Sequence, residues 1–85
     1  MQTIRREHWP GYSVDLGEGF RVHKDRNGRH LEAICWLRTH ELGWELVLNV
    51  NGSLQRSQVC RSRDEILDLT ESWQAALLGR EWQAS

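Results

Sequence analysis

The sequence predicts an α+β fold, an antiparallel β-meander of about four or five strands with one C-terminal α-helix packed on one face. Two observations lead to this prediction. Asn51-Gly52, a tight-turn signature, separates two strand-like segments, and Ser62-Arg63-Asp64-Glu65 forms a capping box before a helical pattern. Further strand-like segments divided by turns precede them. We therefore expect a single α+β domain over residues 9–85, after a flexible arm over the charged, unpatterned residues 1–8.

The hairpin begins with a strand from Trp44 to Val50, in which apolar side chains recur at every second position. Asn51-Gly52 fits a type I′ turn, because both central positions of that turn need positive φ. The return strand is expected from Ser53 to Arg61. With the helix that follows, the two strands predict a ββα unit.

Two registers of this hairpin are compatible with the sequence. With a two-residue loop, Gln55 and Ser57 face the core. With a three-residue loop, Arg56 and Gln58 lie instead on the same face as Leu46. A slip of one residue moves every side chain of a strand to the other face of the sheet. In either register, polar side chains lie on a sheet whose other strands are largely apolar.

The helix is expected over residues 63–78, with Gly79 as its C-terminal cap. One face is apolar and the opposite side is acidic: Ile66, Leu69, Trp73, Ala76 and Leu77 against Asp64, Asp68 and Glu71. This spacing favours Trp73 as a core anchor rather than as a platform for ligand stacking. Trp82 is expected to fold back over the edge of the core, and the alternative is an exposed contact residue.

The N-terminal half predicts further strands. Residues 12–16 alternate as a short strand, Gly17-Glu18-Gly19 is expected to break it, and Phe20 begins another. Asp25-Arg26-Asn27-Gly28 predicts a second hairpin turn. Residues 30–39 then form a strand that is apolar on both faces, which is typical of a central strand.

Composition excludes several classes of function. The formal net charge is −1, from 11 basic and 12 acidic residues, so no overall field attracts nucleic acid or anionic lipid. No segment approaches the length of a membrane span, and the N-terminus lacks the apolar segment of a signal peptide. Two cysteines are too few for a disulfide framework. We expect a cytoplasmic protein with reduced thiols that does not act at a membrane.

The polar return strand is the first candidate binding surface. Gln55, Arg56, Ser57 and Gln58, with Arg61 beyond them, offer hydrogen bonds to a peptide, a second subunit or nucleic acid. The alternative is an edge strand that is kept polar to prevent sheets from pairing. An edge strand can also bind an extended partner through its backbone alone.

A basic hairpin is the second candidate, with Arg21, Lys24, Arg26 and Arg29 around a single acid, Asp25. The turn is flanked by His23 and His30, which a four-residue loop would make a direct cross-strand pair. Two histidines without a third ligand at a recognisable spacing do not predict a metal site. No cofactor is predicted either.

Signatures of catalysis are missing from the sequence. It has no phosphate-binding glycine loop, no zinc-binding spacing of Cys and His, and no Gly-x-Ser-x-Gly elbow. Cys35 lies in an apolar strand, where a thiol is inert. Cys60 precedes Arg61, which favours a lowered pKa and a thiolate. Without a base beside that thiol, we expect a protein that is not an enzyme.

A pattern in the C-terminal half resembles a family of small uncharacterised proteins from proteobacteria. The residues that carry it are Gly43-Trp44-Glu45-Leu46, then Gly52-x-Leu54-Gln55-Arg56-Ser57-Gln58-Val59, then Arg61-Ser62 and Trp73. The resemblance covers roughly residues 36–82 and implies a bacterial, cytoplasmic origin. It implies no mechanism.

These observations favour a non-catalytic protein-interaction module or small homodimeric regulatory protein. The acidic helix face and the arginine-bearing strands, with Arg56 and Arg61 exposed, suit docking between complementary charges. The alternative is a nucleic-acid-binding protein that uses the Arg21–Arg29 hairpin and the polar strand 55–61. The near-zero net charge weighs against it, because neutralised phosphates supply most non-specific affinity.

Overall fold

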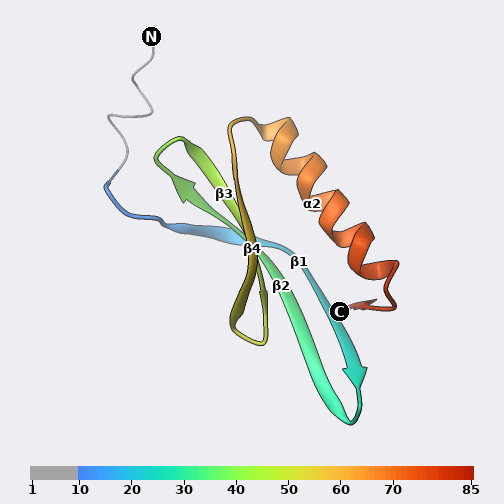
Figure 1. Ribbon diagram of the computed structural model, residues 1–85. Coiled ribbons are helices and arrows are strands. Elements are labelled where there is room, and N and C mark those ends of the chain that lie inside the picture. Colours follow the sequence, from blue (N-terminus) through green and yellow to red (C-terminus); the bar gives the residue numbers. More distant parts are fainter. Residues whose placement is uncertain (1–9) are drawn as a thin grey trace.

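The computed structural model describes residues 10–85 and contains a five-stranded antiparallel sheet with one helix over one face (Figure 1). The elements are β1 (Asp15–Arg26), β2 (Arg29–His40), β3 (Gly43–Val50), β4 (Ser53–Cys60), α2 (Arg63–Leu78) and β5 (Gln83–Ala84). The strand order is β4-β3-β2-β1-β5. The predicted α+β meander is confirmed, and the apolar strand expected over residues 30–39 is its central strand. The expected arm over residues 1–8 lies outside the described residues.

Both predicted hairpins close through two-residue turns with positive φ. Asn27 and Gly28 have φ of 53° and 75°, and Asn51 and Gly52 have φ of 49° and 85°. Such turns match the twist of the strands they join, so the β-hairpins are specified locally. The first loop is therefore not the four-residue loop considered from the sequence, and the direct cross-strand pairing of the two histidines does not occur.

β1 is one continuous strand, so the break predicted at Gly17-Glu18-Gly19 is wrong. The ladder with β2 instead shifts register twice, between Asp15 and Gly17 and between Glu18 and Phe20. Each shift leaves one extra residue on β1, which is how a bulge lets a strand bend without ending. The glycines that signalled a break thus mark bulges.

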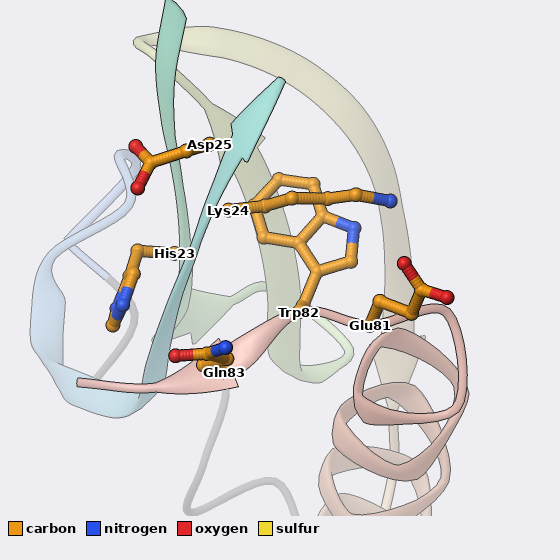
Figure 2. Close-up of a pocket in the computed structure, with 6 residues that line it drawn as sticks. All are labelled: His23, Lys24, Asp25, Glu81, Trp82 and Gln83. Carbon is orange, nitrogen blue, oxygen red and sulfur yellow. The ribbon is translucent and has the colours of Figure 1, made fainter. Parts of the chain in front are cut away.

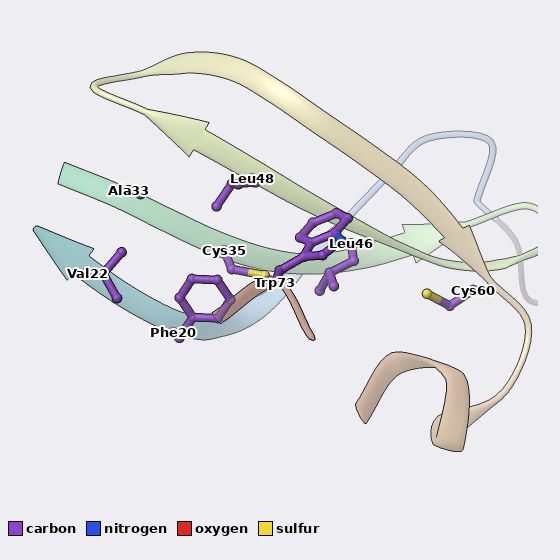
Figure 3. Close-up of a cluster of buried hydrophobic side chains, with 8 residues drawn as sticks. All are labelled: Phe20, Val22, Ala33, Cys35, Leu46, Leu48, Cys60 and Trp73. Carbon is purple, nitrogen blue, oxygen red and sulfur yellow. The ribbon is translucent and has the colours of Figure 1, made fainter. Parts of the chain in front are cut away.

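The core lies between α2 and one face of the sheet (Figure 3). Its buried side chains come from all four long strands and the helix: Phe20, Val22, Ala33, Cys35, Leu46, Leu48, Cys60 and Trp73. Trp73 is 3% exposed, which confirms it as the helix residue that anchors the core. Trp82 is half-buried and packs against this cluster, as predicted. In the described part of the chain, no element covers the other face of the sheet.

The helix is bounded by the residues that the sequence predicted. The Ser62 hydroxyl accepts a hydrogen bond from the Glu65 amide at 3.1 Å, and the Glu65 carboxylate accepts one from the Arg61 amide. Two donors that the helix cannot satisfy are thereby paired. Gly79 is the C-terminal cap but keeps a right-handed φ of −68°. The left-handed conformation falls two residues later, at Glu81, with φ of 71°.

Candidate functional site

The polar strand predicted as a binding surface is an edge of the sheet. Among the described residues, β4 pairs with β3 alone, and residues 53–58 are all exposed. Val59 is half-buried and Cys60 is fully buried, so the strand enters the core only at its end. The outer backbone groups of an edge strand are available to another chain.

A bulge at Gln55 settles which side chains of β4 face the helix. Near the turn, Val50 opposes Ser53, which is the two-residue loop. Beyond the bulge, Leu48 opposes Arg56, so Gln55 is the extra residue. Arg56 and Gln58 therefore lie on the helix side of the sheet. This is the orientation that we predicted for the three-residue loop. The structure combines the loop length of one predicted register with the side-chain orientation of the other.

Arg56 is held against the helix by an aromatic contact. Its guanidinium carbon lies 4.6 Å from the centroid of the Trp73 ring. Arginine can stack on an aromatic face and still present its N–H groups at the rim of the guanidinium plane. The side chain is exposed and covers the outer side of the core's tryptophan. This contact could not be predicted, because it depends on the bulge.

The remaining residues of the polar strand point elsewhere. Ser57 pairs in register with Val47 and lies on the uncovered face of the sheet. Arg61 follows the last residue of β4 and lies between the strand and α2, with its side chain exposed. Gln55, Arg56, Ser57 and Gln58 thus form a contiguous edge, which we call the β4 edge, and Arg61 lies apart from it.

Half of the basic residues of the hairpin have partners within the fold. Arg21 forms ion pairs with Glu18 at 2.9 Å and with Glu32 at 3.0 Å. These hydrogen bonds raise the pKa of Arg21, and the bond to Arg21 lowers the pKa of Glu18. The Nζ of Lys24 donates to the main-chain carbonyl of Arg80 at 2.9 Å. Two of the four basic residues predicted as a binding surface therefore already have partners within the fold.

Arg26 and Arg29 remain at the tip of the hairpin, where they oppose each other in register and are exposed. The two histidines below them are diagonal neighbours, with ring centroids 5.8 Å apart. Each has its own partner: His30 lies 2.9 Å from a carboxylate oxygen of Asp25, and His23 lies 3.0 Å from the hydroxyl of Ser85. Within residues 10–85, no three metal-ligating side chains cluster.

A pocket of about 500 Å³ lies where β5 meets β1 (Figure 2). Lys24 passes beside the Trp82 indole at this site, and Asp25 and Glu81 contribute carboxylates. The pocket therefore holds charges of both signs.

Both thiols are buried and protonated at neutral pH. Burial, together with the nearby Cys60, raises the pKa of Cys35 to about 12. Burial and the Glu65 carboxylate raise the pKa of Cys60 as well. The expectation that Arg61 would lower the pKa of Cys60 is wrong, because the exposed Arg61 side chain does not compensate for the desolvation of the thiolate.

The chain matches no protein-family model, no curated protein and no solved structure. The resemblance of its C-terminal half to small proteobacterial proteins stays a prediction. Within residues 10–85, no helix has both the length and the apolar character that crossing a bilayer requires.

Proposed function

We propose that the protein is a small, non-catalytic interaction module that forms a homodimer by antiparallel pairing of β4 with β4 of a second copy. The observation that carries this proposal is the β4 edge itself. It is a strand with one neighbour among the described residues, it is exposed over residues 53–58, and it is polar. Such an edge offers backbone hydrogen bonds to an incoming strand without exposing an apolar surface.

The order of side chains on β4 suits a symmetric pairing. A two-fold axis at Ser57 places Ser57 opposite its own copy and Arg56 opposite the second copy's Gln58. Opposed serines and an arginine–glutamine pair are compatible cross-strand neighbours, and the two Arg56 side chains are kept apart. The bulge at Gln55 interrupts regular pairing, so the proposed pairing is centred on the part of the strand that follows it.

Charges elsewhere on the surface support docking between copies. The acidic side of the helix is exposed and comprises Asp64, Asp68 and Glu71. Arg56 on β4 and Arg61 before the helix are also exposed. A surface with separated acidic and basic patches favours one orientation of approach over others.

Cysteine cross-linking tests the pairing directly. Opposed residues in an antiparallel pair have Cα atoms about 4.5–5.5 Å apart, which is within the range of a disulfide. Ser57→Cys should therefore form a covalent dimer under mild oxidation, whereas Ser72→Cys, exposed on the helix, should do so far more slowly. Sedimentation of the unmodified protein should show a dimer that dissociates on dilution. A monomer at all concentrations, with equal cross-linking of both variants, would overturn the proposal.

The nucleic-acid alternative rests on Arg26 and Arg29, which have no charged partner among the described residues. Its support is weaker, because Arg21 and Lys24 are engaged within the fold. Sedimentation with mixed-sequence DNA or RNA at low salt decides between the two. A complex that salt dissociates and that the Arg26→Ala, Arg29→Ala double variant cannot form would replace the homodimer proposal.

A further inference from the structure

A second pocket, of about 370 Å³, lies on the helix side of the sheet. Leu48 and Val50 of β3 form its apolar floor, and the indoles of Trp73 and Trp82 line it. Arg56 and Arg80 also line it, and both are exposed. We propose that this pocket, which we call the arginine pocket, binds a carboxylate carried on an apolar or aromatic body.

The charge of the arginine pocket points to an anion. No carboxylate is among its lining residues. Neither Arg56 nor Arg80 forms an ion pair with any described residue. Two guanidinium groups beside an apolar wall create a positive potential that water screens less than it does on an open surface.

The geometry of Arg56 prepares it to bind a carboxylate. Its guanidinium carbon lies over the Trp73 ring, and no carboxylate of the described residues forms an ion pair with its N–H groups. That arrangement fits the two-point hydrogen bonding of a carboxylate. The backbone of Arg80 is held nearby, because its main-chain carbonyl accepts the hydrogen bond from Lys24 Nζ.

The apolar floor of the pocket indicates what kind of body the carboxylate is attached to. Apart from Gln55 and the two arginines, the lining is leucine, valine, alanine and two indoles, so most hydroxyl groups of a sugar or another polyhydroxylated body would lose hydrogen bonds with water there. A volume near the lower end of about 300–1,000 Å³ suits a body of one ring or a short branched chain. The shared chemistry is that of an aryl-alkanoic acid or of an apolar residue at the C-terminus of a peptide.

The neighbouring pocket beside β5 differs from the arginine pocket in its charge. It shares Trp82 but adds the carboxylates of Asp25 and Glu81. Like charges disfavour an anion there, so the two sides of the same indole differ in the ligand they accept. Any anion that binds near Trp82 should therefore perturb Trp73 and Arg56 rather than His23.

The test compares one apolar body with and without its charge. We expect 4-phenylbutyrate to shift the indole N–H resonances of Trp73 and Trp82 saturably in NMR spectra of the isotope-labelled protein. 4-Phenylbutyramide should bind at least about tenfold more weakly, because it lacks the charge-assisted hydrogen bonds. Arg56→Gln and Arg80→Gln should each weaken binding of the acid by a similar factor and leave the affinity for the amide unchanged. Arg63→Gln, at the opposite end of the helix, is the matched control.

A second comparison identifies the source of the carboxylate. An N-acetylated peptide ending in phenylalanine, with a free or an amidated C-terminus, is titrated in the same way. Tighter binding of the free peptide than of phenylbutyrate assigns a peptide C-terminus. Binding of phenylbutyrate alone assigns a free acid. Equal affinity for acid and amide, or affinity unaffected by both arginine substitutions, would overturn the proposal.

Discussion

Arg56 and Trp73 form a cation–π pair that joins the edge strand to the helix, with the guanidinium carbon 4.6 Å from the ring centroid. One partner is exposed and the other is 3% exposed, so the pair lies at the boundary of the core. Because the bulge at Gln55 places Arg56 on this face, packing of the helix depends on an irregularity in the strand opposite it.

The first prediction concerns the energy of this pair. Arg56→Gln should lower the free energy of unfolding by about 0.5–1 kcal/mol, the usual contribution of an exposed cation–π contact. The same substitution in a Trp73→Leu background should have almost no effect, because the ring is gone. Urea denaturation of the four proteins measures the coupling. An equal loss in both backgrounds would show that Arg56 acts through another contact.

Truncation of the anchor should be far more costly. Trp73→Ala removes a side chain that is 3% exposed, and such changes cost about 3–5 kcal/mol. Domains of this size have a total stability of only about 0.05–0.15 kcal/mol per residue, so much of it should be lost. Circular dichroism and urea denaturation report the change. A loss below about 1 kcal/mol would mean that Trp73 does not anchor the core.

Stability should fall at alkaline pH because of Cys35. Its pKa is raised from 9.0 to about 12 in the folded protein, so the folded state holds the thiol proton more tightly than the unfolded state does. The resulting stabilisation is complete below pH 9.0 and is lost as the pH rises toward about 12. Urea midpoints across this range should decrease more steeply for the unmodified protein than for Cys35→Ala. An identical pH dependence of the urea midpoints in the two proteins would contradict the raised pKa of Cys35.

Gly43 should tolerate no side chain. Its φ is +144°, and a Cβ there would lie 2.5 Å from the carbonyl oxygen of Cys60. Gly17 is the matched control, since its φ is +156° and no atom lies within 4 Å of its Cβ position. We expect Gly17→Ala to cost about 1–3 kcal/mol from backbone strain. Gly43→Ala should cost about 1–3 kcal/mol more, because the overlap forces the strands apart. Equal thermal unfolding temperatures would refute this difference.

Local signals explain why much of the fold could be predicted. The turns at Asn27-Gly28 and Asn51-Gly52, and the capping box at Ser62, are set by residues adjacent in sequence. The apolar spacing of the helix was enough to identify Trp73 as buried. These features need no knowledge of distant contacts.

The candidate site depended on long-range geometry and was less predictable. The bulge at Gln55 arises from the pairing of β4 with β3. The sequence alone leaves two registers of this pairing open and does not predict the bulge that combines them. The two-residue strand β5 pairs with β1, which lies far from it in the sequence. No local sequence pattern indicates this pairing. Arg80 and Trp82 line the same pocket as Arg56 only because α2 packs over the sheet, so the arginine pocket had no signature in the sequence.

The bulge at Gln55 also sets how the β3–β4 hairpin can change in length during evolution. Losing the single residue Gln55 would restore an uninterrupted ladder and leave Arg56, Gln58 and Cys60 on the faces they now occupy. Losing one residue between Arg56 and Cys60 would turn the end of the strand over and expel the Cys60 thiol from the core. The hairpin therefore contains one point at which a deletion is nearly silent, next to a segment whose length cannot vary.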